Sequence, residues 1–557
     1  MKTIAILFIP VMIFPACLFS QEFDWIVSSG VYAICRSGAS DQDNNLCFVG
    51  EFAQSIQFGD TTLNNPGTGT KIFIVKVDSS GQVLWARSAG GGQLDYCFEV
   101  VCGSDQCFYI TGNFYGTSQF GQYTLYSAGT NDVFLAKYSS EGECLWVRQG
   151  GGPNYFDNSM TLALDTCNNC YITGCFDYEA QFGDTTLFAG VPSGGNPNEE
   201  WGGEIFLSKY DPDGGFIWAR YIPGTHHINR GHSLVCDANN QIWMNGKFEG
   251  ELWFENDTLV SYGDFDIFMA CFDANGQICW SDRAGGSNHD KPSPSGIGID
   301  NYGNIYHTGY FQETAFFGND PVNSAGGWDL FLVKYDPLGQ VSWIITEGGT
   351  ENDRAYGMAI HENDIYLTGY FLGQVFFGGN QLLTSMGSKD IFVSRYSTNG
   401  DFIWATQAGG PGEDWAFHIH RDPNTGIYLG GFHHNGAIFG DTVLNTIGYQ
   451  NQFFGSMTDT ATIVMIEDQG ESFQTGCYPN PFRSRVNFTI TLTEPEAVIL
   501  KIFSLTGQEP ETAISQPFSS GTHLISMDLE SLPPGIYVYF IGAGTYSEKG
   551  KLIKTAW

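Results

Sequence analysis

An acidic residue or its amide recurs at one place in the repeating part of this sequence, just after a Gly-Gly loop and before a predicted strand. The residues are Asp95, Asp157, Asn229, Asp290, Asp353 and Asp414. Carboxylate oxygens are hard ligands that suit Ca²⁺, so a ring of them at a channel mouth would bind that ion weakly. Short acidic side chains also accept backbone N–H bonds and fix loops, which is the preferred interpretation. No other cofactor is expected.

A second group of candidate ligand contacts lies in and after the longest connection of the sequence, residues 190–204. The group consists of Trp201, His226, His227 and Arg230. Long loops that gather on one face of a scaffold usually carry its function. We therefore expect a ligand, such as a glycan, a protein or a mineral cation, to contact this face near the channel mouth.

The sequence contains no identifiable set of catalytic residues. The turn before the repeated Trp resembles the Asp-box of sialidase-like propellers, but the spacing from Gly81 to Trp85 is one residue too long. A glycosidase also needs paired acids, and none can be identified. Cys167 and Cys170 have a zinc-like spacing but lack a second pair. We expect a protein that is not an enzyme, with a glycosidase-like hydrolase as the alternative.

Charge and cysteine content narrow the classes of partner. The chain of 557 residues has 24 basic against 60 acidic residues, a formal charge of -36, which argues against binding nucleic acid. Hydrophobic residues make up 42%, enough for a sizeable core. In an exported chain we expect some of the cysteines to pair across hairpin turns, for example Cys35 with Cys47.

The first 20 residues are predicted to be a signal peptide. Lys2 precedes an apolar run that is too short to span a bilayer comfortably, and cleavage is expected before Gln21. Lipidation at Cys17 is the alternative. No transmembrane segment is expected in the mature chain.

Three marks recur along residues 21–458. Trp25, Trp85, Trp146, Trp218, Trp280, Trp343 and Trp404 follow one another at about 60 residues, or about 72 across the 190–204 connection. A Gly-x-Phe motif and a hydrophobic-Phe pair repeat with them. One unit contains short apolar runs at 354–360, 365–371, 390–396 and 401–407, separated by turn residues, which predicts four antiparallel strands. Units of this length predict the blades of an all-β, seven-bladed β-propeller.

The strand around Trp25 is expected to complete the last blade and so to close the ring. The pattern at Asp132, Asp329 and Asp390, in which Asp-x-Phe leads to Tyr, Gly and Trp, resembles SBBP-type propeller repeats of exported bacterial proteins. That resemblance implies a scaffold and no particular activity.

After a linker at 459–476, residues 477–557 are expected to form a small β-sandwich with strands at 486–492, 498–505, 523–529 and 536–541. This segment resembles the type A sorting domain of Bacteroidetes type IX secretion. The matching residues are Tyr478, Pro479, Asn480, Pro481, Phe482, Gly507, Gly535, Tyr537 and Lys551. The resemblance implies handling by the type IX machinery, passage of the outer membrane, removal of the domain, and release or attachment at the cell surface.

Together these observations predict an exported β-propeller that acts as a binding or adhesion scaffold. A secreted hydrolase and a structural surface-layer component are the alternatives.

Overall fold

The computed structural model describes residues 23–153, 157–189, 203–226, 228–255, 257–422, 424–446, 449–459, 473–478, 482–492, 495–504, 513–533, 535–543 and 546–555. They belong to two compact units, which we call the large unit (23–459) and the C-terminal unit (473–555). All regular elements in these ranges are strands. None of the described residues belongs to a helix that could cross a membrane.

The large unit consists of antiparallel sets of four strands, which we call repeat units. In order from the first strand of each set to its fourth, they are β2 (Tyr32–Ser40), β3 (Leu46–Ala53), β6 (Lys71–Val77) and β7 (Val83–Ala89); β8 (Tyr96–Cys102), β9 (Phe108–Phe120), β10 (Tyr123–Tyr138) and β11 (Cys144–Gly151); β12 (Asn158–Leu164), β13 (Cys170–Phe176), β16 (Glu204–Tyr210) and β17 (Phe216–Ile222); β18 (Arg230–Cys236), β19 (Ile242–Phe248), β22 (Asp266–Phe272) and β23 (Ile278–Gly286); β24 (Lys291–Ile299), β25 (Ile305–Phe317), β26 (Asp320–Tyr335) and β27 (Val341–Glu347); β28 (Arg354–His361), β29 (Asp364–Phe371), β32 (Asp390–Ser397) and β33 (Phe402–Ala408); and β34 (Trp415–Asp422), β35 (Gly426–His433), β38 (Asn451–Met457) and β1 (Phe23–Ser29).

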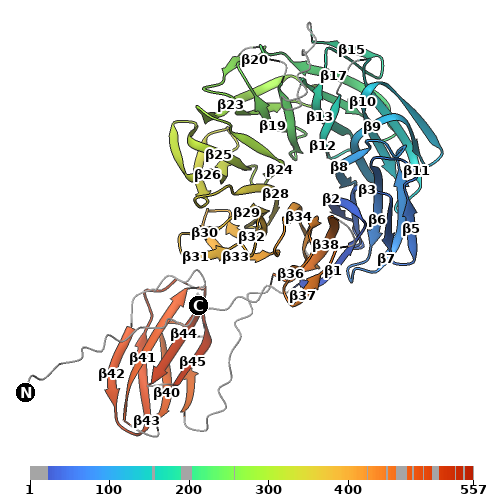
Figure 1. Ribbon diagram of the computed structural model, residues 1–557. Helices are drawn as coiled ribbons and strands as arrows, with labels where there is room; N and C mark the ends of the chain where they lie inside the picture. Colours follow the sequence, from blue (N-terminus) through green and yellow to red (C-terminus); the bar gives the residue numbers. More distant parts are fainter. Residues whose placement is uncertain are drawn as a thin grey trace, which may run out of the picture. The chain divides into compact units, whose positions relative to one another are not determined.

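The first strands of the repeat units face a common centre (Figure 1). They contact one another in the order β2, β8, β12, β18, β24, β28, β34 and β2 again. The prediction that the strand around Trp25 joins the last unit is confirmed, because β1 pairs antiparallel with β38. The chain therefore meets its own beginning within one sheet.

Short hairpins join the second and third strands of most units. They are β4 (Ser55–Phe58) with β5 (Thr61–Asn64), β14 (Glu179–Phe182) with β15 (Thr185–Phe188), β20 (Glu251–Phe254) with β21 (Asp257–Val260), β30 (Gln374–Phe377) with β31 (Gln381–Thr384), and β36 (Ala437–Phe439) with β37 (Thr442–Leu444). In the other two units the tips of β9 and β10, and of β25 and β26, make the same extension. Several of these hairpins bridge to the loop that ends the preceding unit, as Leu252 does with Gly224.

The uninterrupted apolar runs of the second and third strands follow from burial on both faces. Every residue of β13 and β16 is buried, because other sheets cover both sides of the strand. The fourth strands are partly exposed, as in β17. Hydrophobic burial is the main source of stability here, because each inner sheet fills the space between its neighbours.

The repeated Lys and Trp have one structural role. Lys137 Nζ and Trp146 Nε1 both donate to the backbone oxygen of Pro212, in the turn of the next repeat unit, over 3.0 and 3.2 Å. Lys76 and Trp85 share the oxygen of Ser140 in the same way. The repeated sequence therefore ties each of these units to its neighbour.

The repeated glycine of the Gly-x-Phe motif is required by a bulge in the first strand. At Gly174 an added Cβ would lie 1.8 Å from the backbone oxygen of Asn158. The pairing of β12 with β13 shifts register between Ser159 and Thr161, directly after this contact. Any side chain larger than hydrogen would force the two strands apart.

The C-terminal unit contains two sheets that share one core. One sheet consists of β39 (Phe473–Tyr478), β40 (Arg485–Leu492) and β43 (Gly521–Asp528), and the other of β42 (Ala513–Phe518), β41 (Glu496–Ser504), β44 (Gly535–Ala543) and β45 (Tyr546–Lys554). Phe488 of the first sheet contacts Tyr539 of the second, with ring centroids 4.9 Å apart. The four strands predicted here are confirmed, and β39, β42 and β45 are additional.

Candidate functional site

The recurring acidic residues hold the loops that lead into the first strands. Asp353 Oδ2 accepts the Gly349 N–H over 2.7 Å, and its Oδ1 accepts the Leu372 N–H over 3.0 Å. The others bond in the same way; in Asn229 the amide oxygen accepts the Glu249 N–H, while its nitrogen donates to the His226 oxygen. All six side chains are buried, with at most 1% exposed. This geometry gives them the loop-bracing role, and direct contact with a ligand stays a prediction.

The second predicted group is described only in part. Trp201 and His227 lie outside the described residues. His226 is exposed and Arg230 is half-buried at the start of β18. Arg230 is thus the one member that the structure places at the centre-facing strands.

Four of the bracing residues lie beside a second buried aspartate. The pairs are Asp132 with Asp157, Asp266 with Asp290, Asp329 with Asp353, and Asp390 with Asp414. In one of them, an added Cβ at Gly285 would lie 2.7 Å from Asp266 Oδ1 and 3.0 Å from Asp290 Oδ2, so the two carboxyl groups converge on the glycine. Burial first, and then the neighbouring carboxylate, raises the pKa of Asp290 and of Asp353 to about 7.

A band of alternating cations and aromatic rings crosses the first strands just after these braces. We call it the cation–aromatic band, and its members are Lys247, Phe265, Lys291, Tyr310, Arg354, Tyr370, Lys389, Trp415, Phe417, Arg36 and Phe98. Its buried part includes both of the first two lysines, whereas both arginines and the aromatic rings of Trp415, Phe417 and Phe98 are half-buried.

Arg354 is the centre of one half of the band. Its Cζ lies 3.9 Å from the ring centroid of Trp328 and 4.5 Å from that of Tyr310. Lys389 Nζ is 4.6 Å from the ring of Trp415. Cations within about 6 Å of an aromatic face are attracted by its quadrupole. The rings therefore hold these cations in place without neutralising their charge.

The other half of the band joins two neighbouring repeat units. Lys247 Nζ and Lys291 Nζ lie 4.0 and 5.4 Å from the same ring, that of Phe265. Across the centre, Arg36 stacks 4.8 Å from Phe417. In a chain with a formal charge of -36, this grouping of cations is a local reversal of sign.

The band was missed in the sequence, although two repeated motifs marked its positions. Lys291, Arg354 and Trp415 each follow directly after a bracing aspartate, and Lys247 and Tyr370 are central residues of Gly-x-Phe motifs. Pairing brings the two motifs together, because Arg354 is the cross-strand partner of Tyr370. The signal was the residue type between the repeated marks.

Below the band, a cavity of about 360 Å³ is lined by the first strands of the repeat units. Glu99 is its one lining carboxylate among the described residues; its oxygens accept the hydroxyls of Ser37 and, over 3.5 Å, Ser295. Burial raises the pKa of Glu99 to about 7 and lowers that of His418 to about 3. A glycosidase needs two acids at its cleavage point, and this cavity presents one.

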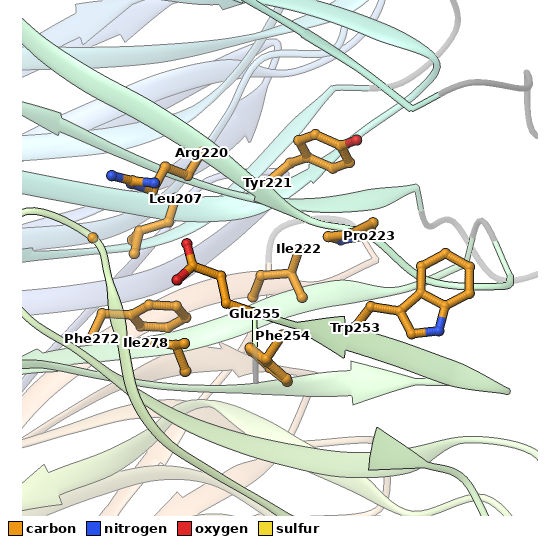
Figure 2. A pocket seen from close by; sticks show the side chains of 11 residues that line it. Leu207, Arg220, Tyr221, Ile222, Pro223, Trp253, Phe254, Glu255, Phe272 and Ile278 are labelled. Carbon is orange, nitrogen blue, oxygen red and sulfur yellow. The ribbon is translucent and has the colours of Figure 1, made fainter. Parts of the chain in front are cut away.

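A second cavity of about 350 Å³ lies between two repeat units, beside the β20–β21 hairpin. Figure 2 shows Trp253 at one end and the polar groups of Arg220 and Glu255 at the other. Ile222, Phe254 and other apolar side chains form its floor. The guanidinium of Arg220 already donates to the Asn275 oxygen over 3.1 Å and stacks on Trp218, so it serves the junction between the units.

The predicted metal and cysteine chemistry finds little geometric support. Within the described ranges, no group of three or more His, Cys, Asp or Glu side chains is placed to hold a metal ion. The expectation that cysteines pair is wrong for this structure, since all thirteen described cysteines are free. The facing hairpin strands place most of these thiols in the core, where they pack as small apolar groups.

In the C-terminal unit, the described motif residues tie the chain end to the core. Phe482 is buried and its oxygen accepts the Thr555 N–H over 2.9 Å, while Tyr537 donates its hydroxyl to the Pro533 oxygen over 2.7 Å. Gly535 begins β44. Pro479, Asn480, Pro481 and Gly507, and the side chains of Tyr478 and Lys551, lie outside the described residues.

Residues 476–555 match the secretion system C-terminal sorting domain family. This match indicates secretion through the type IX system to the cell surface or the extracellular space. The sorting domain therefore accounts for the C-terminal unit and for the way the chain leaves the cell.

The large unit resembles known proteins more distantly. An uncharacterised WD repeat-containing protein of Acanthamoeba polyphaga mimivirus is 22% identical over 464 residues, 67% of this chain, and the chain spans about a third (33%) of that protein's length. A glucose dehydrogenase structure is 10% identical, with a TM-score of 0.30, covering 78% of this chain and 99% of its own. A glycoside hydrolase family 43 arabinoxylan arabinofuranohydrolase from Bacillus subtilis is also 10% identical, with a TM-score of 0.28 and 94% of each chain covered.

Proposed function

We propose that the secreted protein is a seven-bladed β-propeller of the SBBP-repeat type that binds an extracellular ligand at the cation–aromatic band. In this proposal each repeat unit is one blade, and β1 closes the ring. The cyclic contacts of the first strands and the pairing of β1 with β38 support the ring. The C-terminal unit is then the sorting domain that the type IX machinery handles and removes.

The observation that carries a binding function is the band itself. Its cations lie against aromatic rings at the centre-facing ends of the first strands, where several blades contribute to one surface. Half-buried aromatic and Arg side chains are the residue types that dominate binding energy at interfaces. A purely structural surface-layer component would not need this arrangement at the centre of the ring.

A hydrolase is the less supported alternative. Glu99 has a raised pKa and lines a cavity, as a general acid would, but the same cavity offers no second carboxylate among the described residues. Its hydrogen bonds to Ser37 and Ser295 instead join opposite blades across the centre.

The test is to incubate the purified full chain with a glycan array and, in parallel, with a panel of glycosidase and peptidase substrates. We expect retention on the array that Trp415→Ala and Arg354→Gln weaken, and no turnover. Turnover abolished by Glu99→Gln would establish the hydrolase instead. Retention unchanged in both band variants would remove the band as the site.

A further inference from the structure

The charges of the band are arranged as they would be around a bound anion. Arg230 and Lys247 are direct cross-strand partners in β18 and β19, and Lys247 shares the Phe265 ring with Lys291. Like charges placed opposite each other in a sheet are destabilising. Lys247 is 3% exposed and Lys291 is 9% exposed, so water screens their repulsion poorly. An anion placed among these cations would relieve that repulsion.

Buried hydrogen-bonding groups without partners gather at the same place. His232, between Arg230 and Ser233 on the first strand, is 8% exposed, and neither of its ring nitrogens makes a hydrogen bond among the described residues. The Nε atom of Arg354 and the Nε1 atoms of Trp328 and Trp415 are in the same condition within that part of the chain. Buried polar groups normally have a partner. Three of these side chains offer only N–H donors, so the missing partner is an acceptor.

The aromatic members narrow the class of anion. Trp415, Phe417 and Phe98 are half-buried between the cations, and flat rings of this kind stack on the apolar faces of sugars. Nucleic acid would also stack, but its phosphates carry one charge per nucleotide in a dense row, which a protein with a formal charge of -36 repels. A saccharide with one acidic group per residue or fewer fits the spacing of cations and rings better.

We propose that the cation–aromatic band, with Arg230 and His232 beside it, binds an anionic saccharide whose carboxylate or sulfate groups accept hydrogen bonds from Arg230, Arg354 and Lys389. This rests on the proposed binding function and specifies its ligand class. The planar guanidinium groups match the two oxygens of a carboxylate or sulfate, and Trp415 supplies the stacking surface between them.

The test uses the purified full chain and calorimetry with four probes. These are an oligogalacturonate for carboxylate, a heparin-derived oligosaccharide for sulfate, a neutral cello-oligosaccharide and a single-stranded DNA oligomer. We expect one of the two acidic saccharides to bind, with affinity falling as salt rises, and the neutral saccharide and the DNA not to bind. The two acidic probes distinguish a carboxylate from a sulfate ligand.

Arg354→Gln should weaken the acidic saccharide by at least about tenfold, as expected for loss of a charge-assisted hydrogen bond. Arg87→Gln is the matched control, because Arg87 also stacks on a tryptophan, at 5.6 Å, but lies on a fourth strand and donates to the next unit's turn. If Arg354→Gln does not fold, Lys389→Gln replaces it, since Lys389 is half-buried and pairs with Glu413 over 3.2 Å.

The outcomes separate the two proposals. Equal binding of neutral and acidic saccharides that Trp415→Ala abolishes and Arg354→Gln leaves unchanged would overturn the anion inference and leave the band as a binding site. Binding of DNA in place of saccharide would also overturn it. No saccharide binding with any probe, or binding that no band variant alters, would overturn both.

Discussion

Replacing Asp353 by Asn should change how the stability of the protein depends on pH. The Asp353 pKa is about 7 in the folded protein, raised by burial and by Asp329, against an ordinary value of 3.8. Because the folded pKa is the higher one, the folded state binds the proton more tightly. The resulting stability is fully present below pH 3.8 and is lost as the pH rises through about 7.

The size of the effect follows from the two pKa values. Between pH 5 and pH 8 the wild-type protein should lose about 3 kcal/mol of unfolding free energy through this carboxyl group, at about 1.4 kcal/mol for each pKa unit. Asn cannot ionise, so the variant lacks this loss. It has a separate cost that does not vary with pH, about 1–3 kcal/mol, because its NH₂ group meets the Gly349 N–H. Asn229 avoids that cost since its amide nitrogen reaches the His226 oxygen.

The assay is urea unfolding of the full chain at pH 5, 6, 7 and 8, followed by tryptophan fluorescence. Every Trp except Trp557 precedes residue 459, so the signal reports the large unit. The variant should gain about 3 kcal/mol relative to wild type between pH 5 and pH 8. Asp336→Asn is the control, because Asp336 braces a half-buried turn through the Leu338 and Gln340 N–H groups. Parallel pH curves for Asp353→Asn and wild type would refute the account of the buried pair.

Three further perturbations test the fold and the export route. Gly174→Ala should cost more than about 3 kcal/mol, because its Cβ would overlap the Asn158 oxygen, whereas Gly379→Ala, with nothing within 4 Å, should cost about 1 kcal/mol; equal costs in urea unfolding would contradict the bulge argument. Lys137→Met should cost about 2–3 kcal/mol, since it breaks the 2.7 Å ion pair with Asp105 and the bond to the next repeat unit, and an unchanged unfolding midpoint would contradict the tie between units. Deleting residues 477–557 should leave the protein in the periplasm of its host, as judged by fractionation, and surface delivery of the truncated chain would contradict the sorting role.

The strand pattern of the large unit could be predicted because each strand is short, apolar and bounded by turn residues. The strands expected at 354–360 and 390–396 are β28 and β32 to within one residue. The pairing of β1 with β38 was also predictable, because the first Trp lacks a preceding unit and the last unit lacks a Trp. These features are written into local sequence and into counting.

The candidate site depends on contacts that local sequence does not record. Arg354 meets Trp328 from the preceding unit, and Lys389 meets Trp415 from the following one. The cysteines illustrate the same limit, since Cys35 and Cys47 face each other in chain order but are free in the folded strands. Residue spacing predicted the braces, while three-dimensional packing decides which neighbours of those braces form a surface.

The pairing of β1 with β38 makes completion of the last sheet the most non-local event in the folding of the large unit. The two strands are separated by about 430 residues, and closing a flexible loop of that length costs about 5 kcal/mol of chain entropy before any contact is made. The step is affordable only once the intervening sheets have folded and shortened the path between the ends. Until then β38 presents an open strand edge, and a chain still emerging from the inner membrane cannot supply its partner in the finished arrangement. The slowest phase of folding should therefore be the docking of the first strand, after all the others have formed.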